Sequence, residues 1–333
     1  MKFLIIQTAF TGDVVLATPI IEKLKKQYPD SQIDFVLRKG NEDLLKGHPF
    51  IHHLYVWNKK ASKYLDLFRI IREIRRVQYD HVINLQRFAS SGFMTLFSGA
   101  KNSSGFKKNP LSFFFKYRYP HEINGGKHEI ERNLGLIAYL TEIDFQKPKL
   151  YPSSADFASI KKFKNEKEYI CIAPASVWHT KQLPLNTWKK LIQLAQGNYD
   201  IFLLGGASDI DLCNQLLSES GVQANNNLAG KLSYLESAAL MQGARMNFVN
   251  DSAPMHMASA MNANVCAIYC STIPAFGFRP VSDQSFMIEM QGPLYCRPCG
   301  IHGFKACPEK HFKCGKDVTA EKIYAVMSEI QSK

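Results

Sequence analysis

The chain opens with Lys2-Phe3-Leu4-Ile5-Ile6-Gln7-Thr8-Ala9-Phe10-Thr11-Gly12-Asp13-Val14-Val15-Leu16-Ala17-Thr18-Pro19. This stretch decides the fold class. A short apolar run typical of a buried strand ends in a small turn that contains Gly12, and a helical pattern follows it. Strand, loop and helix in this order form the unit of α/β folds whose loop and helix start face a ligand. The sequence therefore predicts a ligand-facing turn around Asp13.

Asp13 has two candidate roles in that turn. An aspartate at the start of a helix often caps it by accepting a hydrogen bond from a backbone N–H group. A carboxylate at a ligand-facing turn can also act as a general base toward a bound hydroxyl. Taken alone, the opening stretch favours the cap and leaves the base open.

A second motif changes that balance. It reads Asn250-Asp251-Ser252-Ala253-Pro254-Met255-His256-Met257-Ala258 and lies between two strand patterns. Together with Gly12-Asp13 and Thr18-Pro19, it resembles the hallmark motifs of the family 9 glycosyltransferases, the ADP-heptose:lipopolysaccharide heptosyltransferases. The resemblance spans most of the chain. It implies the GT-B architecture, an α/β fold of two Rossmann-like domains facing a cleft.

Two domains are also expected from the length of the chain. With 333 residues, 46% of them hydrophobic, the chain is long enough for two cores. Strand and helix patterns alternate before and after a stretch with Pro152 and Ser153-Ser154, which is typical of a linker. We expect a domain over 1–155, to which the resemblance assigns the acceptor. The second domain, 156–333, is assigned the nucleotide sugar and ends in a closing amphipathic helix over 319–330.

Two segments of the first half carry specific predictions. Apolar residues recur at three-residue steps over 64–77, which predicts a helix with arginines on one side and an apolar face made of Leu65, Phe68, Ile71, Ile74 and Val77. Residues 101–127 break the alternation and mix basic residues with Phe113-Phe114-Phe115. We expect a long loop there, either functional or poorly ordered.

The chain is basic, with 41 lysines and arginines against 29 aspartates and glutamates. A basic surface attracts nucleic acids, anionic lipids or phosphorylated glycans. No nucleic-acid module accompanies the charge, so nucleic acid is not an expected partner. The first apolar run is too short for a signal peptide, and no run approaches the roughly 18–20 apolar residues that cross a bilayer. We expect a cytoplasmic protein, peripheral at the inner face of the inner membrane.

The resemblance places the donor in the C-terminal domain. Its motifs match Ser176 and Lys181 to contacts of the donor diphosphate, and Lys181 would neutralise charge on the departing ADP. The helix start at Ser252 and Ala253 offers backbone N–H groups to phosphate, although the family usually has glycine in place of Ala253. Three further donor-binding candidates have alternative roles: Asp209 and Asp251 as helix caps, and His256 as a buried histidine.

The resemblance makes Asp13 the catalytic base of an inverting transfer, because the attacking hydroxyl approaches from the acceptor side. Acceptor contacts are expected beside it at Thr11 and Gly12. Cations of the 101–127 segment are expected to meet acceptor phosphates while aromatic rings enter the lipid interface; they are Lys107, Lys108 and Arg118. The resemblance implies no catalytic metal ion and no cofactor.

The eight cysteines fall into two groups. Four lie in apolar surroundings and are expected in the core; they are Cys171, Cys213, Cys266 and Cys270. The other four form a Cys-x2-Cys-x7-Cys-x6-Cys pattern near His302 and His311; they are Cys296, Cys299, Cys307 and Cys314. This segment is either a structural zinc site or a reduced cysteine-rich loop.

These observations predict an inverting glycosyltransferase that moves heptose from ADP-heptose to the inner core of lipopolysaccharide. Two alternatives stay open. The first is a family member with another nucleotide sugar or acceptor, which a panel of nucleotide sugars would reveal. The second is a non-catalytic basic protein that binds membranes or glycans and releases no ADP.

Overall fold

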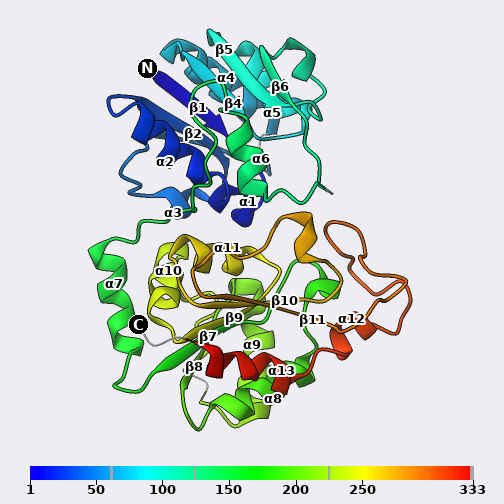
Figure 1. Cartoon of the computed structure of the whole chain (residues 1–333). Helices are drawn as coiled ribbons and strands as arrows, with labels where there is room; N and C mark the ends of the chain where they lie inside the picture. Colours follow the sequence, from blue (N-terminus) through cyan, green and yellow to red (C-terminus); the bar gives the residue numbers. More distant parts are fainter. Residues whose placement is uncertain (61–62, 124, 224–225, 331–333) are drawn as a thin grey trace. The chain divides into compact units, whose positions relative to one another are not determined.

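The computed structural model describes residues 1–60, 63–123, 125–223 and 226–330, and divides the chain into two compact units, 1–151 and 152–333 (Figure 1). The boundary lies close to the one expected after residue 155. The last three residues of the expected C-terminal domain lie outside the described ranges. Within those ranges no helix is both long enough and apolar enough to cross a membrane.

The first unit is built on a six-stranded parallel sheet with the order β3-β2-β1-β4-β5-β6. Its strands are β1 (Lys2–Ile6), β2 (Gln32–Arg38), β3 (His53–Trp57), β4 (His81–Asn84), β5 (Asn102–Phe106) and β6 (Tyr117–Tyr119). The register pairs Ile6 of β1 with Val36 on one side and with Asn84 on the other. The strand order changes direction between β1 and β4. Ligands of open α/β sheets bind at the carboxyl ends of the strands beside such a switch point.

Helices cover both faces of this sheet (Figure 1). They are α1 (Thr11–Val15), α2 (Thr18–Gln27), α3 (Glu42–Leu45), α4 (Lys63–Val77), α5 (Ala89–Phe97) and α6 (Glu129–Gly135). Helices α4 and α5 pack on the face that carries Leu4 and Ile6. Helices α2 and α6 pack together on the other face, where the Phe3 ring contacts Tyr28. Each large apolar side chain buried in these layers contributes about 1.5–3 kcal/mol.

Helix α4 covers the predicted range, but its predicted apolar face is only partly confirmed: Ile74 is buried, and Ile71 and Val77 pack against the core. Leu65 and Phe68 are exposed, and the residues that face the core are Leu67, Ile70 and Ile74. An α-helix has 3.6 residues per turn, so residues at strict three-residue steps drift around the axis. Spacings of three and then four residues stay on one side, which explains the observed face.

Residues 101–127 do not form the expected long loop. Strands β5 and β6 extend the sheet, with a 3-10 turn at Ser112–Phe114 between them. Strand β5 was missed because most of its residues are small and polar, without the apolar run by which strands are recognised. Gly105 has a packing reason, since a Cβ atom there would lie 2.7 Å from the ring of Phe115.

The second unit contains a five-stranded parallel sheet with the order β11-β10-β9-β7-β8. Its strands are β7 (Tyr169–Ala173), β8 (Asp200–Leu203), β9 (Met246–Asn250), β10 (Val265–Tyr269) and β11 (Ser285–Glu289). Strand β11 was not predicted from the sequence. The order changes direction between β7 and β9, which makes the carboxyl ends of these two strands the switch point of this sheet.

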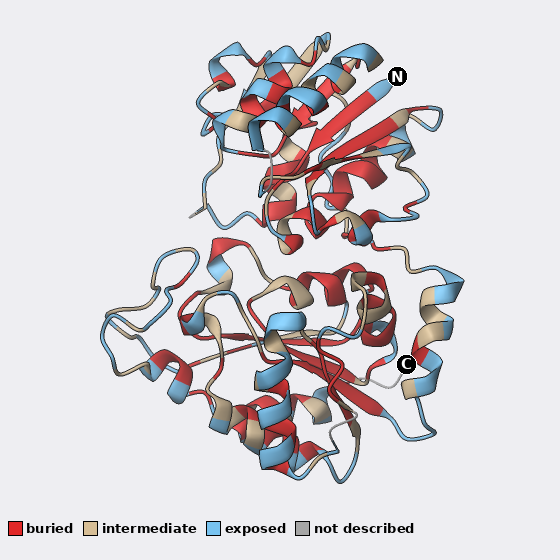
Figure 2. Cartoon of the chain, turned by 180° about the vertical axis from the view of Figure 1, so that it is seen from behind, coloured by how far each residue is buried: buried red, intermediate tan, exposed pale blue. Residues whose placement is uncertain are grey.

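Helices also cover both faces of the second sheet (Figure 1). They are α7 (Ser154–Ile160), α8 (Leu185–Ala195), α9 (Ile210–Ser220), α10 (Tyr234–Gly243), α11 (Ala253–Ala260), α12 (Lys313–Lys316) and α13 (Ala320–Ala325). Helices α8, α9 and α13 share one core, which contains Trp188, Leu216, Ile323 and the strand residue Ile268. Helix α10 packs against α7 and α11. The central strands of the two sheets, such as β4, β7, β9 and β10, are buried along their whole length (Figure 2).

Two predictions about the ends of the second unit need correction. The expected linker runs directly into α7, because the Ser153 side chain caps this helix by accepting the N–H of Asp156 at 3.2 Å. The expected closing helix over 319–330 ends at Ala325 and continues as the 3-10 turn Val326–Glu329.

Candidate functional site

Asp13 lies at the carboxyl edge of the first sheet, beyond the loop 7–10 that follows the switch-point strand β1. It belongs to the short helix α1 instead of the predicted turn. Its Oδ2 atom accepts a hydrogen bond from the N–H group of Phe10 at 3.1 Å. The carboxylate therefore supports the start of its own helix, in agreement with the cap interpretation, and this bond leaves the rest of the carboxylate to a ligand.

The surroundings of Asp13 favour its protonated form. The side chain is half-buried, and this burial raises the pKa of Asp13 from 3.8 to about 6. The Glu129 carboxylate raises the pKa further, whereas the Phe10 N–H group and the Arg38 guanidinium lower it. A carboxylate with this pKa is mostly ionised at neutral pH and still basic enough to accept a proton. Asp13 therefore has the properties of a general base.

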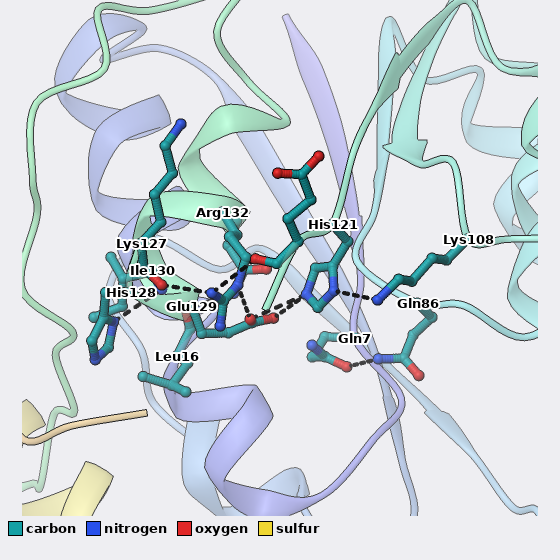
Figure 3. Close-up of polar contacts among 12 residues, drawn as sticks. Gln7, Leu16, Gln86, Lys108, His121, Lys127, His128, Glu129, Ile130 and Arg132 are labelled. Carbon is teal, nitrogen blue, oxygen red and sulfur yellow. Dashed lines mark hydrogen bonds and ion pairs between the residues drawn. The ribbon is translucent and has the colours of Figure 1, made fainter. Parts of the chain in front are cut away.

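Glu129 is the centre of a buried polar network (Figure 3). Its carboxylate accepts a hydrogen bond from Arg132 at 2.6 Å and contacts His121 Nε2 at 3.0 Å. Burial alone would raise the pKa of Glu129, but His121 and Arg132 outweigh it and hold the pKa below its usual range. Glu129 is therefore a fixed negative charge that acts on Asp13.

The residues expected to bind the acceptor have different surroundings. Lys108 reaches the network, with its Nζ atom 3.5 Å from His121 Nδ1 (Figure 3). Lys107 is exposed, and Arg118 is exposed with its guanidinium over the Phe113 ring, 5.7 Å from the centroid. Among the described residues, no contact links either of these two cations to Asp13. The structure thus brings only Lys108 of the three toward the base.

Thr11 and Gly12 precede Asp13 in α1. The Thr11 hydroxyl is buried and donates to Asn41 Oδ1 at 3.1 Å, and the Asn41 amide donates to the Ala9 carbonyl at the same distance. Thr11 therefore fixes the loop after β1 to the start of α3. Gly12 is half-buried and remains the better placed of the two for an acceptor.

Further polar side chains at this edge were missed by sequence reasoning. Arg38 ends β2, Lys59 follows β3 and Gln86 follows β4. The Gln86 amide donates to Gln7, as Figure 3 shows, and Lys59 Nζ donates to the Thr8 carbonyl at 2.7 Å. Burial lowers the pKa of Lys59 to about 8. The position of each residue after a strand was a usable signal, because parallel strands end at one edge.

In the second unit, Lys181 and Asp251 form an ion pair at the carboxyl edge of the sheet. Lys181 Nζ lies 2.6 Å from Asp251 Oδ2, with both side chains largely buried. The Thr272 hydroxyl donates to the same oxygen at 2.7 Å. Lys181 follows β7 and Asp251 follows β9, the two switch-point strands. The cap interpretation of Asp251 is wrong, since Ser252 is the N-cap of α11; a contact with a sugar stays a prediction.

The start of α11 is the next part of the Asn250–Ala258 motif. Among the described residues, the Ser252 side chain forms no capping hydrogen bond, so backbone N–H groups of the first turn can bind an anion. Ala253 is the first helical residue and has no positive φ, so this backbone does not need the glycine that the family usually has. His256 is buried one turn further along.

The loop 174–184, which contains Ser176 and Lys181, is held by a residue of the same motif. The Asn250 amide donates to the Pro174 carbonyl at 2.7 Å, and Asn250 Oδ1 accepts the N–H of Leu183 at 3.0 Å. Ser176 lies in this loop and is half-buried. Asn250 therefore positions the loop, a role that sequence reasoning did not assign to it.

Asp209 is the N-cap residue of α9, one of its two expected roles, but its side chain bonds to the start of the preceding 3-10 turn Ala207–Asp209 and not to α9. Its Oδ2 atom accepts the N–H of Gly206 at 2.8 Å, just before α9 begins. Gly205 approaches it so closely that a Cβ atom there would lie 2.8 Å from Asp209 Cβ. A contact between Asp209 and a ribose stays a prediction.

Thr180 ties the Lys181 loop to the segment 296–314. The Thr180 N–H donates to the Phe304 carbonyl at 3.1 Å, and the Phe304 N–H donates to the Thr180 hydroxyl at 2.8 Å. The Ser271 hydroxyl donates to the same Thr180 oxygen at 3.0 Å. Gly303 has a φ of +73°, and a Cβ atom there would lie 2.8 Å from that oxygen. The position of Lys181 thus depends on residues 124 positions later.

The cysteines of this segment do not gather around one point in the described part of the chain. Cys296 Sγ lies 3.8 Å from His311 Nε2, and the Cys299 thiol donates to the Cys296 carbonyl at 3.3 Å. Cys314 is buried in the core. No group of three side chains able to bind a metal ion occurs among the described residues, so the zinc interpretation has no geometric support. The four core cysteines are buried as expected.

Comparisons with known proteins identify relatives over most of the chain. The model of glycosyltransferase family 9 (heptosyltransferase) matches residues 67–303. The lipopolysaccharide heptosyltransferase 3 of Escherichia coli is 29% identical over 83% of this chain and 85% of its own length. The lipooligosaccharide heptosyltransferase 2 of Campylobacter jejuni is 24% identical over 97% of this chain and 96% of its own length.

The fold has solved counterparts as well. The structure of E. coli ADP-heptose lipopolysaccharide heptosyltransferase II matches with a TM-score of 0.81 at 20% sequence identity, covering 99% of this chain and 98% of that one. At this identity the likeness is one of fold. It confirms the predicted fold class, two α/β domains with parallel sheets as in GT-B heptosyltransferases.

Proposed function

The chain belongs to glycosyltransferase family 9, the heptosyltransferases, and we propose that it transfers heptose from ADP-heptose to a lipopolysaccharide inner-core acceptor with inversion at the anomeric carbon. The names of the curated relatives support the acceptor class, because they specify lipopolysaccharide or lipooligosaccharide. The name of the solved relative supports the donor, since it specifies ADP-heptose.

The observation that carries this proposal is Asp13, a half-buried carboxylate with a pKa raised to about 6 at the switch point of the first sheet. In the proposed step, the acceptor hydroxyl oxygen attacks the anomeric carbon of the heptose. The bond from that carbon to the diphosphate oxygen breaks, and its electron pair leaves with ADP. The hydroxyl proton passes to the Asp13 carboxylate. A general base of this kind contributes about 10²–10⁴-fold to the rate.

We assign the donor diphosphate to Lys181 and the N-terminus of α11. Negative charge grows on ADP as the bond breaks, and an ammonium group together with aligned N–H groups stabilises it. Asp251 holds the Lys181 ammonium at the carboxyl edge of the sheet, 2.6 Å away. The backbone at Ser252 and Ala253 would meet the phosphates, while the remaining contacts are assigned to Ser176, Asp209 and His256. With these groups the transfer is proposed to need no catalytic metal ion, so activity should survive EDTA.

We assign the acceptor to the N-terminal unit. Gly12 and Lys108 are the candidates with the best access to Asp13, because Gly12 adjoins it and Lys108 contacts the network that acts on it. Lys107 and Arg118 are exposed cations that suit phosphates farther out on a glycolipid. The proposal includes work at the inner face of the inner membrane, where such an acceptor is embedded.

The test is the variant Asp13→Asn. Asparagine keeps the shape and the bond to the Phe10 N–H group but cannot accept the proton. We expect kcat to fall at least about a hundredfold, with the affinity for ADP-heptose unchanged in calorimetry. The matched control is Asp43→Asn, an exposed aspartate of the same unit that should keep parent kinetics.

Three outcomes would contradict this proposal. Retention of more than about a tenth of the parent kcat by Asp13→Asn would leave Asp13 as a cap only. Faster transfer from another nucleotide sugar in a donor panel would replace ADP-heptose. No release of ADP with any donor and acceptor, together with binding to glycans or vesicles, would favour a non-catalytic binding protein.

A further inference from the structure

A groove of about 520 Å³ lies between α4 and α5 on the outer side of the first unit. Its walls are mainly apolar, and the residues that matter here are Tyr64, Leu67, Phe68, Ile71, Phe88 and Phe93. None of them belongs to the candidate site around Asp13. The groove follows from the rotated face of α4, because the apolar residues that the core does not use point outward beside α5.

The rings around this groove are unusually exposed. Tyr64 is 67% exposed, Phe68 is 64% exposed and Phe93 is 42% exposed. The rings of Phe93 and Phe97 stack with their centroids 6.0 Å apart. Single exposed apolar residues are ordinary, but a contiguous aromatic patch on one helix pair marks an interaction surface.

One cation, Lys63, lines the groove, and further cations lie along the same part of the chain. Residues 59–97 contain eight lysines or arginines against three aspartates or glutamates. Arg69 is neutralised by Asp66 and Glu73. In contrast, Arg72 and Arg76 are exposed and have no ion-pair partner among the described residues. Arg72 follows Phe68 by four residues and thus lies on the same side of α4.

The groove begins at the edge of the sheet that carries Asp13. Helix α4 follows β3 and α5 follows β4, so both helices start at the carboxyl edge, as does the loop after β1. Lys59, just before α4, donates to the Thr8 carbonyl of that loop at 2.7 Å. A surface that engages the groove is therefore adjacent to the acceptor side of the proposed reaction.

We propose that the α4–α5 groove docks the protein onto a bilayer that contains anionic phospholipids. Exposed aromatic rings enter the boundary between headgroups and acyl chains, and the exposed arginines of α4 bind phosphates. The purpose of this surface rests on the proposed function, because a lipid-borne acceptor must be reached at the membrane. The test of the surface is independent of the proposed function, because vesicle binding is measured without donor or turnover.

Charge complementarity selects this occupant over a second copy of the chain. A two-fold symmetric contact through the groove would bring two surfaces of the same positive sign together, which opposes association. Phospholipid phosphates supply the opposite sign at the depth of the arginines, with apolar chains directly beneath. Only the bilayer matches both the apolar groove and the cations along the same part of the chain.

The first experiment measures flotation with phosphatidylcholine vesicles that contain about 30% phosphatidylglycerol. The variant Phe68→Ser/Phe93→Ser removes two exposed rings and should weaken binding at least about tenfold, since each ring buries substantial apolar area. Its matched control is Ile143→Ser/Phe145→Ser, two exposed apolar residues of the same unit outside the groove. The control should weaken binding less than threefold, taking about 0.6 kcal/mol as the limit.

The second experiment tests the charges. Arg72→Ser/Arg76→Ser should weaken binding to the anionic vesicles about thirtyfold and reduce its salt dependence, because each cation near the surface contributes about 1 kcal/mol and every 1.4 kcal/mol is a factor of ten. Lys161→Ser/Lys162→Ser makes the same charge change at exposed lysines of the other unit and should have a small effect. Pure phosphatidylcholine vesicles should not separate these two variants.

The proposal is overturned if the parent chain does not bind anionic vesicles, or if the groove variant binds as tightly as the parent. Greater loss in a further variant, Phe113→Ser/Phe114→Ser, would place the membrane contact on the 3-10 turn instead. A dimer in light scattering that dissociates in Phe68→Ser/Phe93→Ser would assign the groove to a second copy. Absence of heptose transfer by the parent would overturn the proposed function and leave these binding results standing.

Discussion

The two switch points of this molecule carry carboxylates in opposite electrostatic situations. Asp13, at the first, is half-buried near the fixed charge of Glu129, and its pKa rises to about 6. Asp251, at the second, is buried against the Lys181 ammonium and the Thr272 hydroxyl. Asp251 directly follows β9, and Asp13 lies in the first helix after β1, so both residues stand at the carboxyl edge of a parallel sheet. The same topological place therefore holds one carboxylate that is poised for a proton and one that is neutralised by a cation.

This difference matches the two chemical tasks that we propose for the two residues. A general base works best when its pKa lies near the operating pH, because it then accepts the proton of the attacking hydroxyl readily. Surroundings that destabilise the carboxylate anion raise the pKa toward that range. A group that binds a diphosphate must present positive charge in a fixed place, which the ion pair and the tied loop provide. The comparison can be tested with variants of each unit. In the second unit the variant removes the cation that neutralises Asp251, and in the first unit the variants remove the Asp13 carboxylate or the Glu129 charge that raises its pKa.

Lys181→Ala should have the largest effect. It leaves Asp251 buried without its cation, and an unpaired buried charge destabilises a protein by about 3–5 kcal/mol. It also removes the ammonium proposed for the diphosphate, so ADP affinity should fall at least about tenfold. Urea unfolding and calorimetry measure the two effects. The control is Lys189→Ala, whose pair with Glu219 is exposed and contributes about 0–1 kcal/mol; equal stability of the two variants would contradict a balanced buried pair.

Asp13→Asn should stabilise the protein at alkaline pH. Because the pKa of Asp13 is about 6 in the folded chain and near 3.8 when unfolded, the folded state binds the proton more tightly. This contribution is fully present below about pH 4 and is lost as the pH rises through about 6. The variant lacks this loss and should be more stable by about 1–3 kcal/mol above pH 7, with no difference near pH 4. Thermal unfolding of the variant and the parent at both pH values tests this prediction. A stability difference that is the same at both pH values would contradict the raised pKa of Asp13.

Gly303→Ala tests whether geometry, beyond charge, maintains the donor side. The added Cβ atom would press on the Thr180 and Ser271 hydroxyls, and the tie to the Lys181 loop should loosen at a cost of about 1–2 kcal/mol beyond the backbone strain. Gly300→Ala is the matched control, because Gly300 also has a positive φ and no atom within 4 Å of the added carbon. ADP affinity should fall in the first variant only, and equal losses would show backbone strain alone.

Glu129→Gln should have the smallest effect and a defined direction. Removal of the charge that raises the pKa of Asp13 lowers that pKa, so the acid limb of the kcat profile should move to lower pH by up to about one unit. The same variant leaves Arg132 with fewer partners, so unfolding must be followed at each pH. A shift to higher pH, or none in a folded variant, would remove Glu129 from the control of the base.

The sequence was sufficient to place both carboxylates. Gly12-Asp13 lies in the turn region after the first apolar strand pattern and Asn250-Asp251 lies at the end of another, and a parallel sheet brings such residues to one edge. It also yielded the alternation of strands and helices that specifies the fold class. The apolar face of α4 was only partly predicted, because three-residue steps do not match the helical repeat. Strand β5 was not predicted, because most of its residues are small and polar.

The charged groups that act on these two carboxylates could not be predicted from the sequence pattern. Lys181 meets Asp251 because β7 pairs with β9, and the alternation of elements does not encode that order. Glu129 acts on Asp13 because α6 packs beside α2, an arrangement set by the tertiary core. Charge compensation depends on such contacts between distant segments, so sequence reasoning could name the residues but could not assign their pKa values or their ion pairs.

The tie between Thr180 and Phe304 also bears on how the protein is made. A ribosome delivers the chain from its N-terminus, and domains generally fold in that order. The unit that holds Asp13 can therefore be finished while Lys181 still lacks its anchor, which is synthesised 124 residues after Thr180. A nascent or truncated chain that stops before Gly303 would carry the proposed base, whereas its proposed diphosphate site would lack both this anchor and the part of the core that α13 supplies. Retention on an ADP resin is thus expected only after the C-terminal unit has been translated to its last core residues.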